Sequence, residues 1–181
     1  LLDGASAVIF SDDGLYAYVS AHEGNVVSWF SRNADTGALS YLGDDEGLGW
    51  SDGLALSPDG KHLYVASYLG DAVSWFERNA STGGLVLVGD LENGVNGMDG
   101  LDGVRNIVFS ADGLHAYITA ENNGHSVSWY DRNTSTGVLT FVDKIHSNMG
   151  GSGVLGAYAV TLSEDESHAY VVGAEAVSWY D

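Results

Sequence analysis

The tetrapeptide Val-Ser-Trp-Phe spans Val27–Phe30, and the same Val-Ser-Trp-aromatic pattern returns at Val73–Phe76, Val127–Tyr130 and Val177–Tyr180. The four serines are 46, 54 and 50 residues apart. A motif that recurs with a period near 50 residues is typical of solenoids, propellers and other repeat arrays. The chain therefore consists of successive copies of one unit.

Each copy contains four segments with the composition of β-strands. The first is almost continuously apolar, as a strand buried on both faces requires; its copies are Ala7–Ser11, Gly53–Ser57, Asn106–Ser110 and Ala159–Ser163. In three copies an Asp-Gly pair then predicts a hairpin, because both residues can take positive φ. The second strands are Tyr16–Ser20, His62–Ala66, His115–Thr119 and His168–Val172.

The Val-Ser-Trp-aromatic motif forms the third predicted strand. In three copies an Arg-Asn-x-x-Thr-Gly turn follows and leads to a fourth strand, at Ala38–Leu42, Leu85–Val88 and Val138–Val142. Four antiparallel strands per unit of about 46–54 residues describe a propeller blade. The sequence predicts an all-β propeller domain or propeller fragment over residues 1–181, with blades at 5–43, 51–89 and 103–143 and a partial fourth blade at 156–181.

The second copy resembles the blades of bacterial lactonase-like β-propellers, which include 6-phosphogluconolactonases and YVTN-type surface repeats. The resemblance rests on Leu54–Ser67, Ala72–Phe76 and Thr82–Leu85, and it extends over essentially the whole chain. Propellers of this type usually have seven blades, so the resemblance implies that about half of a ring lies outside these residues. It implies a fold more strongly than a function, because such blades occur in enzymes, binding proteins and surface proteins.

Three arrangements would protect the open ends of an incomplete ring, since natural sheet proteins avoid unpaired edges. The chain is part of a longer polypeptide, or two copies pair into a ring of about eight blades, or four blades close with an irregular last one. The first arrangement is favoured and pairing comes next. The expected partner is therefore a protein, or further copies or segments that complete the propeller.

The composition is strongly acidic, with 25 acidic residues, six basic residues and a formal charge of −19. Such a surface repels phosphate backbones, which argues against nucleic-acid binding. No apolar run is long enough to cross a bilayer, so no membrane insertion is expected. The chain has no cysteine, which excludes thiol chemistry. We expect an extracellular, cell-surface or periplasmic protein, in which Asn79 and Asn133 would fit the N-glycosylation sequon.

A ligand site is expected where the inner strands begin, at the mouth of the central channel. One repeat position there holds a varied polar set, Ser6, Asp52, Arg105 and Tyr158, although packing would permit one residue type. Trp50 lies outside the repeat pattern in a nearby loop and is a further candidate contact. Acid–base or oxyanion roles are open to such groups. No catalytic residue is assigned, because no nucleophile–base pair is evident and no histidine is close in sequence.

Calcium is the cofactor that the sequence favours, although none is required. Calcium binds oxygen-rich, glycine-bearing loops, and acidic segments precede two of the inner strands. The candidate ligands are Asp44, Asp45, Asp90, Glu92, Asp99 and Asp102. None of these segments has the spacing of an EF-hand loop, and solvated acidic turns are the alternative interpretation.

The remaining repeated residues are interpreted as structural. We expect Trp29, Trp75, Trp129 and Trp179 to pack between blades. We expect Arg32, Arg78 and Arg132 to bind carboxylates or turn carbonyls in their own or an adjacent blade. His62, His115 and His168 occupy one repeat position, which places them too far apart to share a zinc ion.

Three functions are compatible with these patterns. A non-enzymatic extracellular or surface propeller, acting as a binding or scaffold module, is favoured by the regular repeats and the absence of a catalytic cluster. The lactonase resemblance implies the first alternative, a lactone hydrolase that uses polar groups at the channel mouth. The second alternative is a structural subunit of a larger assembly, joined through its open blade edges.

Overall fold

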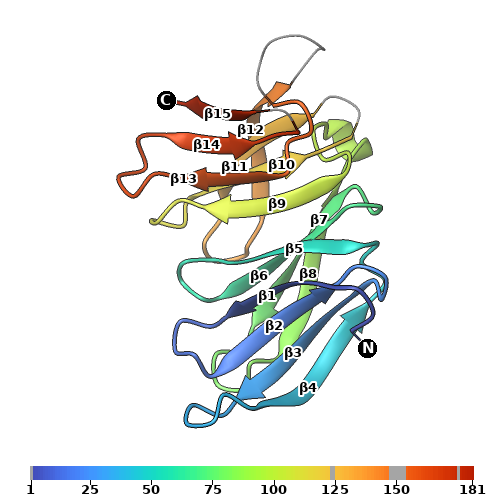
Figure 1. The fold of residues 1–181 in the computed structure, drawn as a ribbon, viewed down its shortest axis with the longest axis vertical. Coiled ribbons are helices and arrows are strands. Elements are labelled where there is room, and N and C mark those ends of the chain that lie inside the picture. Colours follow the sequence, from blue (N-terminus) through green and yellow to red (C-terminus); the bar gives the residue numbers. More distant parts are fainter. Residues whose placement is uncertain (1, 123–124, 147–153, 175) are drawn as a thin grey trace.

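The computed structural model describes residues 2–122, 125–146, 154–174 and 176–181, and its strands form four separate antiparallel sheets (Figure 1). The first sheet contains β1 (Ala5–Phe10), β2 (Tyr16–Ala21), β3 (Val26–Arg32) and β4 (Leu39–Glu46). The second contains β5 (Ser51–Leu56), β6 (His62–Ser67), β7 (Ala72–Arg78) and β8 (Leu85–Glu92). A short 3₁₀ helix, η1 (Val95–Gly97), lies in the connection to the third sheet.

The third sheet contains β9 (Val104–Phe109), β10 (His115–Ala120), β11 (Ser126–Arg132) and β12 (Leu139–His146), and the fourth contains β13 (Ala159–Leu162), β14 (Ala169–Val172) and β15 (Val177–Tyr180). In every sheet the strands are hydrogen-bonded in chain order. The all-β fold of four-stranded blades with a three-stranded fourth sheet is confirmed.

The sheets follow one another as an open arc. The inner strand of each sheet contacts that of the next, from β1 to β5, β9 and β13. The first and fourth sheets lie at opposite ends of the molecule (Figure 1). The alternative of a closed ring of four blades is therefore wrong, because the strands of the first and fourth sheets, as far as the chain is described, lie at opposite ends of the arc.

The Asp-Gly hairpins of the first three sheets form where they were predicted. In the first sheet the amide of Ser11 donates to the carbonyl oxygen of Tyr16 at 2.9 Å, and the Asp13 carboxylate accepts from the Ser11 hydroxyl at 2.6 Å. Only Gly14 has positive φ, at 68°. The predicted hairpin is confirmed by the antiparallel pairing of β1 with β2, and the aspartate side chain holds the turn closed from within.

The fourth strands are longer than predicted and run to Glu46, Glu92 and His146. A bulge allows this, because Trp29 pairs with Gly43 whereas Phe30 pairs with Tyr41, and the same shift occurs in the next two sheets. A Cβ atom on Gly43 would lie 2.6 Å from Cζ2 of Trp29. Glycine is thus required where the indole ring crosses the neighbouring strand.

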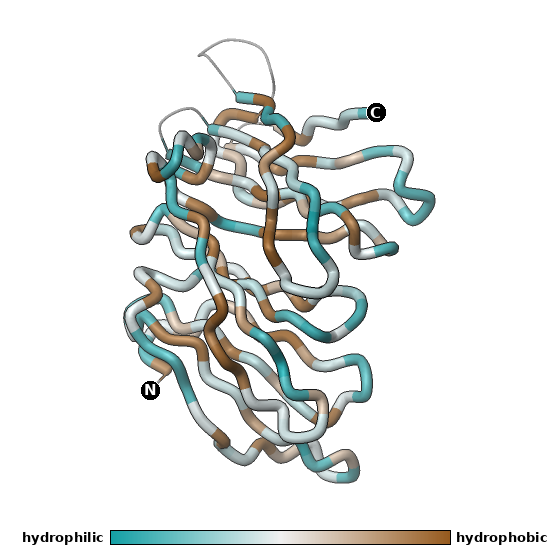
Figure 2. Tube along the Cα trace, turned by 180° about the vertical axis from the view of Figure 1, so that it is seen from behind, coloured by the Kyte–Doolittle hydropathy of each residue, from teal (hydrophilic) through white to brown (hydrophobic). Residues whose placement is uncertain are grey.

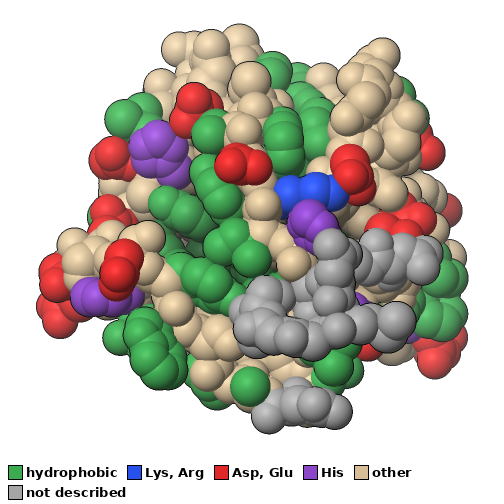
Figure 3. All heavy atoms as spheres, turned by 90° about the horizontal axis from the view of Figure 1, so that it is seen from above, with side chains coloured by type: hydrophobic (Ala, Val, Ile, Leu, Met, Phe, Trp, Pro, Cys, Tyr) green, Lys and Arg blue, Asp and Glu red, His purple; other side chains and the backbone are tan. Residues whose placement is uncertain are grey.

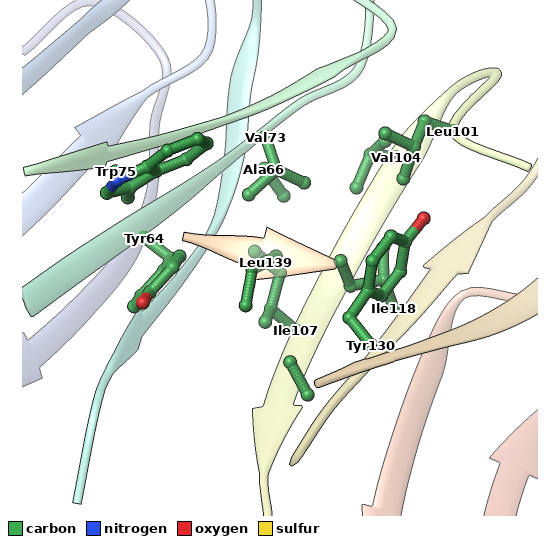
Figure 4. Close-up of a cluster of buried hydrophobic side chains, with 11 residues drawn as sticks. Tyr64, Ala66, Val73, Trp75, Leu101, Val104, Ile107, Ile118, Tyr130 and Leu139 are labelled. Atoms are coloured by element: carbon green, nitrogen blue, oxygen red, sulfur yellow. The ribbon is translucent and has the colours of Figure 1, made fainter. Parts of the chain in front are cut away.

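The hydrophobic core lies in layers between the sheets. Hydrophobic stretches follow the strands, whereas the turns are hydrophilic (Figure 2). The layer between the second and third sheets joins Tyr64 and Trp75 on one side to Ile107, Tyr130 and Leu139 on the other (Figure 4). Trp75 is only 5% exposed, which confirms packing between blades at this position. Trp179, in contrast, is 69% exposed at the end of the arc.

A tyrosine–arginine–glycine joint also connects successive sheets. The Tyr64 hydroxyl donates to the Gly137 carbonyl oxygen at 2.7 Å and accepts from Nε of Arg132 at 2.9 Å. Tyr64 is fully buried, and burial raises the pKa of its phenol, which keeps the hydroxyl protonated. Arg132 also donates to the Gly113 carbonyl oxygen of its own sheet at 3.0 Å and to Asp59 of the preceding sheet at 3.0 Å.

The joint between the first and second sheets has the same design. Tyr18 donates to the Gly83 carbonyl oxygen at 3.0 Å, and Arg78 Nε donates to Tyr18 at 2.6 Å. The structural interpretation of the repeated arginines is confirmed for Arg78 and Arg132. It also explains the Arg-Asn-x-x-Thr-Gly turn, because its arginine and glycine both bind one tyrosine of the preceding sheet.

Candidate functional site

Polar and aromatic side chains from three sheets meet where the inner strands begin. Asp52 is the second residue of β5 and Arg105 the second residue of β9, so adjacent sheets place them side by side. His22, Tyr68 and Glu121 each follow directly after the second strand of a sheet. We call the following group the mouth cluster: His22, Trp50, Asp52, Tyr68, Arg105 and Glu121.

The charged members form a continuous chain of contacts. His22 Nδ1 lies 2.5 Å from Asp52 Oδ1, and the other oxygen of Asp52 accepts from Arg105 Nη1. Nε and Nη2 of Arg105 lie 2.6 and 2.5 Å from Oε2 of Glu121. The four side chains are between 12% and 26% exposed, so they are partly desolvated yet reachable by a small molecule.

The guanidinium group of Arg105 is charged and largely occupied. Burial acts to lower the pKa of Arg105, but the hydrogen bonds to Glu121 and Asp52 outweigh it and raise that pKa. A guanidinium group has five N–H donors, and the three contacts to carboxylates leave two for a ligand. One arginine between two carboxylates leaves the ionic part of the cluster acidic.

Two aromatic rings border these charges. The Trp50 ring lies 4.1 Å from the His22 ring and stacks on Tyr68 at 6.2 Å with an interplanar angle of 20°. The Arg105 guanidinium lies 3.8 Å from the centre of the Tyr68 ring. Trp50 has positive φ, at 49°, and its amide donates to Asn25 Oδ1 at 2.7 Å. A tryptophan held in the left-handed region by its neighbours is consistent with a functional role.

The structure brings together three of the five sequence candidates for ligand contact. Asp52, Arg105 and Trp50 belong to the mouth cluster. Ser6 lies beside them, and its hydroxyl donates to the Ser51 carbonyl oxygen at 2.7 Å without contacting the Asp52 carboxylate. Tyr158 is 42% exposed, and its carbonyl oxygen accepts from Thr119 at 3.2 Å.

Sequence reasoning missed His22, Tyr68 and Glu121. No histidine is close to Asp52 in sequence, but the sheets bring His22, 30 residues away, into contact with it. A signal was available, since the repeat position four residues after Tyr18, Tyr64, Tyr117 and Tyr170 also varies between copies, as His22, Tyr68, Glu121 and Ala174. The same argument that selected Asp52 and Arg105 would have found them.

The six candidate calcium ligands are dispersed. Asp44 and Asp45 lie within β4, and Asp90 and Glu92 within β8, so these four belong to strands rather than to the predicted loops. Asp99 is paired with Lys144, which lowers the pKa of its carboxyl. In the described part of the chain, no three acidic or histidine side chains are close enough to share a metal ion. Calcium binding stays a prediction.

No described helix is long and apolar enough to cross a membrane.

Solved structures show the fold. The chain superposes with a TM-score of 0.81 and 17% identity on a candidate 6-phosphogluconolactonase from Bacteroides uniformis, with 97% of this chain and 50% of that chain covered. For the periplasmic gluconolactonase PpgL of Pseudomonas aeruginosa, the TM-score is 0.76 at 19% identity, over 92% and 46% of the two chains. For hydrazine synthase of Kuenenia stuttgartiensis, the TM-score is 0.73 at 21% identity, with 99% of this chain and 46% of that chain covered.

These neighbours share an architecture and differ in activity, so they establish fold alone. The chain spans about half the length of the solved propellers that it matches. A comparison with curated proteins gives no match. Residues 2–97, more than half of the sequence, match the family described as lactonase, seven-bladed β-propeller. The chain therefore belongs to the lactonase family of seven-bladed β-propellers.

Proposed function

We propose that the mouth cluster binds a neutral, hydroxyl-rich ring, such as a sugar or a sugar lactone. The observation that carries this proposal is the meeting of two carboxylates with the Trp50–Tyr68 pair. Carboxylates accept hydrogen bonds from hydroxyl groups, and an aromatic face offers an apolar surface for the C–H side of a sugar ring. Ligand sites typically combine a few polar groups with such a surface.

The charge distribution favours a neutral ligand over a phosphorylated one. The guanidinium group of Arg105 is already paired with Asp52 and Glu121, so its charge is not available to bind a phosphate. The chain carries a formal charge of −19, which adds a repulsive field for anions. Among the described residues, the mouth cluster thus offers no cation left unpaired for a phosphosugar.

In this proposal the propeller acts as a binding module outside the cytoplasm. The acidic composition and the named periplasmic relative support that location. Further blades, from the same polypeptide or another, would complete the channel wall around the ligand. Sequence and structure together thus favour a ligand-binding scaffold.

The test is a binding titration of the chain with neutral sugars and aldonolactones, and with their 6-phosphorylated forms. The proposal predicts saturable binding of a neutral compound, weaker binding of its phosphorylated form, and loss of affinity in Trp50→Ala. Trp179→Ala is the matched control, since Trp179 lies in the last strand, outside the cluster. Equal affinities for the neutral and phosphorylated forms would refute the preference, and unchanged binding by Trp50→Ala would refute the site.

A second function, lactone hydrolysis, is favoured by the His22–Asp52 pair. Asp52 engages Nδ1 of His22, which leaves Nε2 as the nitrogen that can accept a proton. A carboxylate that orients an imidazole in this way is a recurring feature of general bases. His22 would take a proton from water as the water oxygen attacks the lactone carbonyl carbon. The ring C–O bond then breaks, and the ring oxygen receives the proton.

Hydrolysis is measured by acid release from aldonolactones above the spontaneous rate. Removal of a general base lowers the rate typically 10²–10⁴-fold, so we expect such a loss in His22→Asn. His115→Asn is the control, because His115 pairs with Asp131 away from the cluster. Absence of activity on several lactones, with binding intact, would reject hydrolysis and leave the binding proposal standing.

A further inference from the structure

Trp50 occupies a position of the repeat that holds glycine in the other three copies. It stands two residues before Asp52. At the same distance before the equivalent residues of the other inner strands lie Gly4, Gly103 and Gly156. The φ angle is 49° at Trp50, and 65°, 70° and 60° at the three glycines. The backbone is therefore left-handed at this position in every copy, a conformation that glycine adopts readily.

This position lies directly beside the mouth cluster. In the first three sheets its carbonyl oxygen accepts a hydrogen bond from the amide of the residue that follows the second strand. The bonded pairs, with the donor first, are His22 with Gly4 at 2.8 Å, Tyr68 with Trp50 at 2.9 Å and Glu121 with Gly103 at 2.9 Å. A side chain at this position therefore reaches the cluster, and only the second copy places one there.

The tryptophan occupies this position at a conformational cost. The left-handed region brings the Cβ atom of an L-residue too close to the backbone, and a glycine would avoid that cost. Residues in such conformations persist where their surroundings hold them, and they gather at functional sites. The Trp50 ring, between 9% and 36% exposed, lies against His22 and Tyr68.

Asn25 is the residue that holds Trp50. Its Oδ1 accepts from the Trp50 amide at 2.7 Å. Its carbonyl oxygen accepts from the amides of Gly47 and Leu48 at 2.9 and 3.2 Å, and its own amide donates to the His22 carbonyl oxygen at 3.4 Å. One residue thus fastens the loop before β5 to the turn that follows His22.

Asp71 has the same place in the second sheet. Asn25 and Asp71 each stand three residues before the serine of the Val-Ser-Trp-aromatic motif, with φ angles of 51° and 48°. Oδ1 of Asp71 accepts from the Gly103 amide at 2.8 Å. The side-chain acceptor therefore belongs to the repeat, and an amide or a carboxylate oxygen can supply it. Of the two residues, only Asn25 holds a tryptophan.

The charge of the molecule also favours an aromatic contact here. Acidic side chains are spread over the end of the molecule that Figure 3 shows, with few Lys or Arg side chains among them. A further charged contact would act within this negative field. The indole face offers an apolar contact to a neutral ring and adds no charge.

We propose that Asn25 is a positioning residue, which holds Trp50 in its left-handed conformation and so presents the indole ring to a ligand. A ring that is fixed before binding costs less to order on binding. This inference rests on the binding function proposed above. It adds the place of the ligand, at the junction of the first and second sheets, because the other copies have no side chain at the position of Trp50.

The test compares Asn25→Gly with Asn25→Asp in titrations with glucose and with gluconolactone. Glycine keeps the left-handed backbone of Asn25 and removes the acceptor, whereas aspartate keeps the acceptor, as Asp71 does. Asn25→Gly should bind about fivefold more weakly, the equivalent of one neutral hydrogen bond, because a smaller fraction of the chain presents the ring. Asn25→Asp should bind like the wild type. Asp71→Gly is the matched control and should keep its affinity, because Gly103 carries no ring.

Two readouts need no ligand. The near-ultraviolet circular dichroism of the chain, minus that of Trp50→Phe, gives the contribution of Trp50. That contribution should shrink in Asn25→Gly and persist in Asn25→Asp. In thermal melts, Trp50→Gly should unfold about 2–4 °C above Trp50→Ala, since alanine keeps the left-handed strain that glycine relieves.

An unchanged affinity or an unchanged Trp50 spectrum in Asn25→Gly would overturn the proposal. Equal weakening by Asp71→Gly would also overturn it, because the acceptor would then act through the stability of the fold alone. A Trp50→Ala variant that melts as high as Trp50→Gly would contradict the strain. If the wild type binds neither compound while the Trp50 spectrum still depends on Asn25, the positioning role stands and the proposed binding function fails.

Discussion

Replacement of Tyr64 by phenylalanine tests the joint that connects the second and third sheets. The change removes one oxygen atom and keeps the ring, so packing in the core layer is preserved. Tyr64 is fully buried, and its hydroxyl makes two hydrogen bonds, to the Gly137 carbonyl oxygen at 2.7 Å and from Arg132 Nε at 2.9 Å. Both partners lose a bond when the hydroxyl is removed, and neither gains a new partner.

The expected cost follows from these two bonds. A hydrogen bond to a charged group contributes about 1.5–3 kcal/mol, and one between neutral groups about 0.5–1.5 kcal/mol. We therefore expect Tyr64→Phe to lower the free energy of unfolding by about 3 kcal/mol. For a chain of this size, about 1 kcal/mol corresponds to roughly 2–4 °C, so the melting temperature should fall by about 6–12 °C.

The assay is thermal and urea unfolding, followed by circular dichroism, of the wild-type chain, Tyr64→Phe and Tyr117→Phe. Tyr117 occupies the equivalent position but has no hydrogen-bond partner in the described structure, so its variant should differ from wild type by less than about 0.5 kcal/mol. Equal destabilisation by the two substitutions would refute the reasoning. The joint would then contribute only through its aromatic ring.

Three further predictions concern single residues and calcium. Gly43→Ala should destabilise the chain by about 1–3 kcal/mol through overpacking against Trp29, whereas Gly84→Ala, 3.3 Å from Thr82 Oγ1, should cost less in the same melts. Burial and Arg132 lower the pKa of His62, so the unfolded chain binds more protons and stability should fall as the pH drops below 6.5, with a shallower loss in His62→Asn. Calcium binding predicts a higher melting temperature with millimolar calcium and reversal by a chelator; no shift would reject it.

The sequence by itself determined the architecture, because local sequence patterns specify the strands and turns of each blade. The Val-Ser-Trp-aromatic period, the apolar first strands and the turn residues each act within one blade, where propensity and hydrophobic pattern decide the outcome. The Arg-Asn-x-x-Thr-Gly turn was correctly interpreted as structural for the same reason. The hairpin at Asp13 and Gly14 was predicted in the same way, although the hydrogen bond from Ser11 to the Asp13 carboxylate was not.

Only the tertiary structure decided the site and the joints. Asp52 meets His22, 30 residues away, and Arg105, 53 residues away, because adjacent sheets stack, whereas Arg105 meets Glu121 within the third sheet. The same stacking pairs Tyr64 with Arg132 and leaves Tyr117 facing a hollow. Local sequence patterns do not specify which blades are in contact or how far apart their side chains lie. Those long-range contacts form the candidate site of this protein.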